Sequence, residues 1–149
     1  MAHTYTNCLF HCVFSTKNRQ RLISEEIAKR LWPFIGGIAR KNGFRALQVG
    51  GDLDHAHALI SLPPTITVAK ALQEMKGGSS KFVNETFLSR TFGWQDGYGA
   101  FSIGAAAIED VIAYIQNQRE HHQKRTFEEE YIAFLEENGI EYDQRYVFD

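Results

Sequence analysis

A short glycine turn between two strand-like segments constrains the fold of this chain more than any other feature. Residues 44–49 and 54–62 are rich in apolar side chains, and Gly50-Gly51-Asp52 lies between them. Runs of this kind separated by a few turn residues are typical of a β-hairpin. The sequence therefore predicts two neighbouring antiparallel strands, the second ending at Pro63-Pro64.

The segments before the hairpin predict a strand and a helix. Residues 6–16 are apolar on both alternating faces, which is typical of a central strand covered on both sides. Ser24 precedes two glutamates and resembles a helix N-cap, so a helix is predicted from there to about residue 42. Pro33 lies inside this pattern, where the helix could kink or restart.

The segments after the hairpin complete an α+β pattern. A helix is predicted over residues 67–75, resuming after Gly77-Gly78 through residue 87, and the glycine pair indicates a bend near a ligand. Residues 98–104 supply a fourth strand. The order strand, helix, strand, strand, helix, strand predicts a ferredoxin-like βαββαβ sandwich, an antiparallel sheet with helices on one face.

Two C-terminal helices are predicted beyond this core. Residues 105–124 carry an apolar stripe at helical spacing, and Thr126 followed by three glutamates resembles the cap of a last helix that ends near Asn138-Gly139. We expect one domain over residues 1–149, with the core at about 1–104 and the C-terminal helices at about 105–138.

Composition narrows the class of protein. The chain has 149 residues, of which 44% are hydrophobic and 23% charged, the size and make-up of one ordinary domain. No apolar run approaches the roughly 18 residues that span a bilayer, and the first residues lack the pattern of a secretory signal. Cys8 and Cys12 are too far apart along a strand for a disulfide. We therefore expect a soluble, cytoplasmic protein with no membrane partner.

Charge is distributed unevenly along the chain, although the net charge is only -2. Residues 1–92 carry 12 Lys and Arg against 6 Asp and Glu, and residues 93–149 carry 4 against 12. A positive body with an acidic tail can still present a basic surface to phosphates, because salt screens charges beyond about 8 Å. Two ordinary solvated surfaces would give the same count.

His55 and His57 lie two residues apart in the second hairpin strand. Side chains alternate along a strand, so both imidazoles project to the same side, about 6.5 Å apart at Cα, and Ala56 faces the core. Two imidazoles at this spacing can chelate one divalent ion. Histidines in this pattern also occur as ordinary polar residues without a ligand.

Tyr114 and Gln118 lie four residues apart in the predicted helix 105–124. Each helical residue advances about 100°, so the two side chains stand one above the other beside the apolar stripe. A residue there could line a cleft, or the tyrosine could be a half-buried aromatic whose hydroxyl finds a hydrogen-bond partner.

Four segments together resemble one known family: FHCVFSTKNRQRLI at 10–23, DHAHALISLPP at 54–64, LQEMKGGSSKFVN at 72–84 and VIAYIQNQREHH at 111–122. They are similar to the insertion-sequence transposases with a His-hydrophobic-His motif and a single tyrosine, which act on single-stranded DNA, and to their repeat-associated (REP) relatives. The resemblance covers nearly the whole chain in order. Members of the family carry a bulkier residue at Ala56 and often another aliphatic residue at Ala58, which concerns packing, not metal binding.

The resemblance implies roles for four residues. His55 and His57 match the metal ligands of the motif, Tyr114 its nucleophile, and Gln118 a further ligand one turn later. A phenol has a pKa of about 10 and needs a phosphodiester that a cation already polarises. We expect Mg²⁺ or Mn²⁺, although two histidines would also accept Zn²⁺. The tyrosine would form a 5′-phosphotyrosine that a second 3′-hydroxyl displaces, with neither ATP nor water required.

The resemblance also implies a homodimer and single-stranded DNA with hairpin ends as the substrate. The first strands of two copies would join their sheets, and the helix of Tyr114 could complete the metal site of either copy. Cations and hydroxyls that could contact phosphates lie after the first strand and around the glycine pair: Lys17, Arg19, Arg21, Lys76, Ser79, Ser80 and Lys81. Trp94 or Tyr98 could stack on unpaired bases.

Two other functions fit the same residues. A non-catalytic DNA-hairpin-binding relative would bind DNA without metal-dependent nicking. A metal-dependent phosphoesterase would use water in place of Tyr114 and yield no protein-linked nucleotide. The reaction products would distinguish the three hypotheses. The sequence does not identify the DNA hairpin or the cleavage site.

Overall fold

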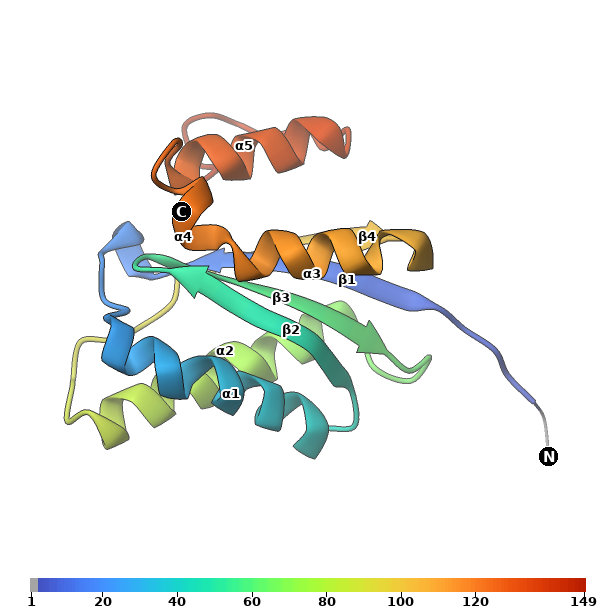
Figure 1. The fold of residues 1–149 in the computed structure, drawn as a ribbon, viewed down its shortest axis with the longest axis horizontal. Helices are drawn as coiled ribbons and strands as arrows, with labels where there is room; N and C mark the ends of the chain where they lie inside the picture. The colour runs from blue at the N-terminus through green and yellow to red at the C-terminus, as the bar shows by residue number, and fades with distance from the viewer. Residues whose placement is uncertain (1–2) are drawn as a thin grey trace.

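The computed structural model of this protein describes residues 3–149 as a four-stranded antiparallel sheet with helices packed against it (Figure 1). The α+β prediction is confirmed. The elements in chain order are β1 Cys8–Ser15, a 3-10 turn Lys17–Arg19, α1 Glu25–Lys41, β2 Arg45–Asp52, β3 His55–Leu62, α2 Val68–Thr86, β4 Gly99–Ile103, a 3-10 turn Ala105–Ala107, α3 Ile108–Gln116, α4 Gln118–His121 and α5 Phe127–Glu137.

The strand order is β2-β3-β1-β4, which places β1 in the interior of the sheet. β1 pairs with β3 along its whole length, and Leu9 to Val13 pair with β4 on the other side. The prediction of a central first strand is therefore confirmed. The expectation that the first strands of two copies join their sheets is wrong for this strand, because β2 and β4 are the edges of this four-stranded sheet.

The hairpin turn lies two residues later than predicted. Gly50, Gly51 and Asp52 are the end of β2, and Leu53 and Asp54 form the turn. A Cβ at Gly50 would lie 2.9 Å from Ile115 Cγ2, and one at Gly51 would lie 2.2 Å from the carbonyl oxygen of His55. These glycines therefore serve close packing against α3 and the adjacent strand.

The first two helices are unbroken, contrary to the predicted interruptions. α1 begins after Ser24, whose side chain accepts a hydrogen bond from the backbone of Ile27, and it continues through Pro33. α2 continues through its glycine pair. A Cβ at Gly78 would lie 2.9 Å from Ile38 Cδ1, so this glycine allows α1 and α2 to pack closely and marks no bend.

The sheet carries a different core on each face. α1 and α2 lie on one side, and α3 and α5 on the other (Figure 1). Ala56, Ala58 and Ile60 of β3 face the α1–α2 core, as the strand alternation predicts. Among residues 3–149, no helix is both long and apolar enough to cross a bilayer.

The C-terminal helices are confirmed, with one correction. The predicted helix 105–124 is interrupted, because α3 ends at Gln116 and α4 begins at Gln118. Thr126 caps α5 in a capping box with Glu129, as its sequence predicts. The interruption at Asn117 sets the direction in which the chain turns toward α5 (Figure 1).

Candidate metal centre and tyrosine

His55 and His57 lie at the start of β3, on the face that α3 and α5 cover. Both side chains are completely buried. His55 lies opposite Ser15 and His57 opposite Val13 of the central strand. The regular strand pairing therefore holds the two imidazoles in fixed positions.

Each of these rings has one nitrogen held by a neighbour and the other directed toward the C-terminal helices. His55 Nδ1 lies 2.7 Å from Asp54 Oδ1, and His57 Nδ1 lies 2.7 Å from His11 Nε2. On the opposite side, His55 Nε2 lies 2.9 Å from Gln118 Oε1. Ligating histidines commonly have their second nitrogen held in this way.

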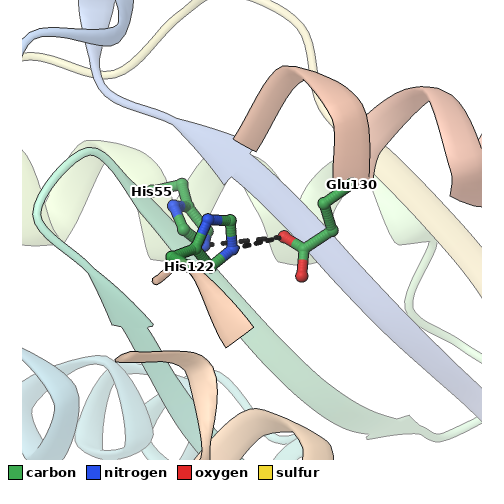
Figure 2. Close-up of side chains that lie close together, drawn as sticks. All are labelled: His55, His122 and Glu130. Carbon is green, nitrogen blue, oxygen red and sulfur yellow. Dashed lines mark hydrogen bonds and ion pairs between the residues drawn. The ribbon is translucent and has the colours of Figure 1, made fainter. Parts of the chain in front are cut away.

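Glu130 of α5 joins the histidines, and its side chain is completely buried. Its Oε1 lies 3.0 Å from His57 Nε2, 3.1 Å from His122 Nε2 and 3.6 Å from His55 Nε2. Figure 2 shows the contacts of Glu130 with His122 and His55. His55 belongs to β3, His122 follows α4 and Glu130 belongs to α5. The other oxygen, Oε2, accepts a hydrogen bond from the hydroxyl of Tyr114.

Tyr114 and Gln118 flank the interruption between α3 and α4 and still lie next to each other. The amide nitrogen of Gln118 lies 3.3 Å from the backbone oxygen of Tyr114, to which it donates. The Tyr114 ring stacks on His121 at 4.7 Å and meets the His57 ring edge-on at 5.8 Å between centroids. One chain therefore brings together Tyr114, Gln118, His55 and His57.

The pKa values in the cluster follow from burial and from two carboxylates, Glu130 and Asp54. Burial lowers the pKa of His57 to about 4, although Glu130 acts in the opposite direction. Burial also opposes a charge on His55, but its hydrogen bond to Asp54 and the charge of Glu130 raise its pKa above the ordinary value. The pKa of Glu130 falls far below the usual range, because hydrogen bonds from His122 and His57 outweigh its burial.

Tyr114 is a protonated phenol in this environment. Burial and the neighbouring Glu130 carboxylate raise its pKa to about 12, while Arg125 and Gln118 act to lower it. A neutral phenol is a weak nucleophile at neutral pH. As a nucleophile this hydroxyl would therefore need a strongly polarised electrophile.

The donor set fits a divalent cation. Ligand atoms of His55, His122 and Glu130 all lie within 4.8 Å of one another. His57 and Gln118 border this group of three: His57 Nε2 lies 3.0 Å from Glu130 Oε1, and Gln118 Oε1 lies 2.9 Å from His55 Nε2. Imidazole ligands suit Zn²⁺ and Fe²⁺, whereas carboxylate and amide oxygens suit Mg²⁺ and Mn²⁺, so this mixed set accepts several divalent ions.

Sequence reasoning missed Glu130, His122 and His11. A usable signal existed for Glu130, since it falls on the buried stripe of α5 with Phe127, Tyr131 and Leu135. A carboxylate inside an apolar stripe needs a partner. The partners lie far away in sequence, so the pattern alone does not identify them.

The predicted DNA contacts fall into distinct environments. Lys17, Arg21 and Lys81 are exposed. Arg19 lies over the Phe148 ring and 3.6 Å from Glu128. Ser79 is completely buried and donates to the backbone of Met75, so its hydroxyl faces the core in this structure.

The remaining predicted DNA-contact residues line two pockets. One, of about 390 Å³, is lined by Lys76, Ser80, Trp94 and Tyr98. Lys76 also donates hydrogen bonds to the backbone of residues 96 and 97. The other, of about 600 Å³, is lined by Arg19, Arg21, Arg119 and, beside the metal centre, Asp54 and His122. The second pocket opens the cluster toward three arginines, with the carboxylates of Asp52 and Glu128 on the same lining.

Comparison with known sequences identifies relatives. The family model described as "Transposase IS200 like" matches residues 4–118. The transposases for insertion sequence element IS200 of Salmonella typhimurium (strain LT2) and Salmonella typhi are each 30% identical over 123 residues, which is 76% of this chain and 80% of theirs. The family match ends at Gln118, before His122 and Glu130.

Solved structures share the fold at lower identity. A protein of Deinococcus radiodurans R1 assigned as a transposase superposes with a TM-score of 0.64 at 20% identity, over 79% of this chain and 95% of that one. A REP-associated tyrosine transposase bound to a REP hairpin superposes with a TM-score of 0.60 at 15% identity, over 82% of this chain and 73% of that one.

Proposed function

This chain belongs to the IS200-like transposase family, and from that membership we propose that it is a metal-dependent transposase of single-stranded DNA with Tyr114 as its nucleophile. One observation carries the proposal. Within a single chain, the Tyr114 hydroxyl and His57 Nε2 contact the two oxygens of one carboxylate, that of Glu130. The nucleophile and the candidate ligands are therefore close enough to act on one phosphate.

The proposed ligands are His55, His57 and Gln118, with Glu130 and His122 as additional donors from the C-terminal segment. All five side chains are buried or nearly so. Mg²⁺ or Mn²⁺ held there would polarise the phosphodiester. Asp54 and His11 would orient the two ligating rings of β3 through their Nδ1 atoms.

Tyr114 performs the proposed cleavage. Its phenolic oxygen, oriented by the hydrogen bond to Glu130, forms a bond to phosphorus while the bond from phosphorus to the 3′ oxygen breaks. The phenol loses its proton and the departing 3′ oxygen gains one. The product is a 5′-phosphotyrosine, which keeps the energy of the broken bond, so a second 3′-hydroxyl can reverse the reaction and join strands.

The proposed substrate is single-stranded DNA that carries hairpins at the element ends. A relative of the same fold is described as bound to a REP hairpin. The pocket lined by Lys76 and Tyr98 offers a cation and one exposed aromatic ring, the combination that binds unpaired nucleotides, whereas Trp94 is buried in the α1–α2 core. Arg19 and Arg21 lie in the pocket that borders the metal centre, where they could hold phosphates next to the cleaved bond.

We also propose a homodimer of single-domain chains. The edges β2 and β4 of the sheet are the strands available for pairing with another copy. Because Tyr114 reaches the histidines of its own chain, each active site would be complete in cis. The cytoplasmic location stays a prediction from the sequence.

The experiment that tests the function is a search for the covalent DNA adduct. Purified protein is incubated with labelled single-stranded oligonucleotides containing hairpin ends, with Mn²⁺ or with EDTA, and protein-linked label is separated on denaturing gels. We expect an adduct with Mn²⁺ only, and none with Tyr114→Phe. Tyr142→Phe is the matched control, since the Tyr142 hydroxyl bonds Glu136 at the surface.

The products also separate the other two functions. DNA binding without nicking by the wild-type protein would identify a hairpin-binding relative. Nicking that persists in Tyr114→Phe would identify a phosphoesterase that uses water. Either result would overturn the assignment of Tyr114.

A further inference from the structure

We propose that His11 is a positioning residue that holds the His57 ring with its Nε2 atom facing the metal centre. The inference rests on the proposed function, since it assigns a role toward the metal that His57 would bind. His11 lies on β1, and its Nε2 is 2.7 Å from His57 Nδ1. Its side chain is 3% exposed, so this contact is shielded from water.

The position of His11 in the central strand makes this contact rigid. β1 pairs with β3 and β4 on its two sides, with residue 11 opposite Leu59 on one side and Phe101 on the other. Phe134 of α5 meets the His11 ring edge-on at 5.1 Å, and Tyr114 of α3 does so at 6.0 Å. Within residues 3–149, the ring makes a single side-chain hydrogen bond, to His57.

His11 is a polar side chain at a buried position that would otherwise favour an apolar residue. Its neighbours on the same face of β1 are Leu9 and Val13, both buried and apolar. Burying an imidazole there costs desolvation of its two nitrogen atoms. An apolar residue would avoid that cost, and therefore the hydrogen bond to His57 is what the histidine adds.

The chemistry of two neutral imidazoles explains why a histidine suits this position. An ionised carboxylate only accepts hydrogen bonds, so His57 Nε2 donates to Glu130, and His57 Nδ1 then accepts from the Nε2–H of His11. With a cation at Nε2, the His57 proton sits on Nδ1 and must be accepted. Neutral His11 can donate in one state and accept in the other, because either of its nitrogens can carry the proton.

The Nδ1 atoms of the two β3 histidines have different partners, and His11 contacts only that of His57. The Nδ1 atom of His55 lies beside the Asp54 carboxylate, which accepts but never donates. That partner keeps a proton on Nδ1 of His55 and so fixes which nitrogen faces the cluster. His57 has no carboxylate at Nδ1, and within residues 3–149 its hydrogen-bond partner at that atom is His11.

The test compares two amide side chains of different length at position 11. The side-chain amide of Gln extends about as far as Nε2 of histidine, whereas that of Asn is one methylene shorter. Binding of Mn²⁺ to the intact protein without DNA is measured by calorimetry for wild type, His11→Gln and His11→Asn. Leu9→Ala, on the same face of β1 but opposite Ser61, controls for loss of packing.

We expect His11→Asn to weaken Mn²⁺ binding by about 10–100-fold, the usual effect of losing a partner of a ligating histidine. His11→Gln should retain most of the affinity, and Leu9→Ala should bind as wild type does. At saturating Mn²⁺, His11→Asn should recover adduct formation, because the residue acts on binding of the ion and not on the attack.

Three results would overturn the role: equal Mn²⁺ affinity of His11→Asn and wild type, equal losses in His11→Asn and His11→Gln, or a loss in Leu9→Ala as large as in His11→Asn. A wild-type protein that binds no Mn²⁺ would instead overturn the proposed metal centre itself. The two failures are therefore distinguishable. Thermal unfolding without metal verifies that each variant is folded.

Discussion

Tyr114 and Glu130 are joined by a hydrogen bond, although α3 carries one and α5 the other. The same carboxylate also accepts from His57 and His122. Helix α5 therefore helps to fix the position of the Tyr114 hydroxyl. In consequence, the C-terminal segment beyond the family match, which ends at Gln118, takes part in the candidate site.

Replacing Glu130 tests this contribution. Glu130→Gln keeps the shape but removes the charge from a buried cluster, and we expect it to lower the free energy of unfolding by about 1–3 kcal/mol. Mn²⁺ affinity and adduct formation should both fall. Denaturant unfolding and calorimetry measure the effects, with exposed Glu137→Gln as the control. Greater adduct formation in Glu130→Gln would show instead that the carboxylate hinders the reaction.

Acid should destabilise the fold in a range that the buried histidines determine. The pKa values of His11 and His57 are about 3 and about 4, below the ordinary value of 6.5. Between the folded values and 6.5 the unfolded state binds more protons, so the contribution of His11 and His57 to stability is fully present above pH 6.5 and falls as the pH drops toward 3. His55 acts in the opposite direction, because its pKa is raised: its contribution is present below pH 6.5 and is lost as the pH rises through its folded pKa. The depressed pKa of Glu130 adds a loss at still lower pH. Denaturant unfolding at pH 7.5, 5.5 and 4 measures the slope.

Substitution of His11 should make that slope shallower. His11→Gln removes one of the two depressed imidazoles and keeps a polar side chain at the position. We expect the difference in unfolding free energy between pH 7.5 and pH 4 to be smaller than in wild type. Equal slopes for the two proteins would mean that His11 is not shielded from protons in the folded state.

Added Mn²⁺ should stabilise the folded protein. A ligand that binds only the folded state at a concentration 100 times its Kd adds about 2.7 kcal/mol to the free energy of unfolding. The melting temperature should therefore rise with Mn²⁺ in wild type and stay unchanged in the double variant His55→Ala, His57→Ala. His3→Ala, at an exposed histidine, should behave as wild type. A rise in the double variant would place the bound ion elsewhere.

Contacts to DNA phosphates should appear in the salt dependence of binding. Arg21 is exposed and lines the pocket beside the metal centre. Arg21→Ala should weaken binding of single-stranded DNA and reduce the slope of log affinity against log salt by about 1. Lys124→Ala, an exposed lysine outside that pocket, is the comparison. An unchanged slope in Arg21→Ala would remove this residue from the interface.

Local pattern was enough to predict the faces on which the key residues lie. Alternation along a strand placed His55 and His57 together opposite Ala56, and helical spacing placed Tyr114 beside Gln118. Ser24 and Thr126 cap their helices as predicted. Each of these inferences depends on residues within a few positions of one another, because backbone geometry alone relates them.

Tertiary structure alone decided which side chains meet. His11 and Glu130 reach His57 from 46 and 73 residues away, and the interruption at Asn117 turns the chain so that His122 and α5 cover the β3 histidines. The sequence pattern predicts a turn at Gly50, whereas in the structure this glycine lies in β2 and allows Ile115 to pack closely against it. Distances between segments remote in sequence depend on how the two faces of the sheet are packed, and periodicity carries no information about that packing.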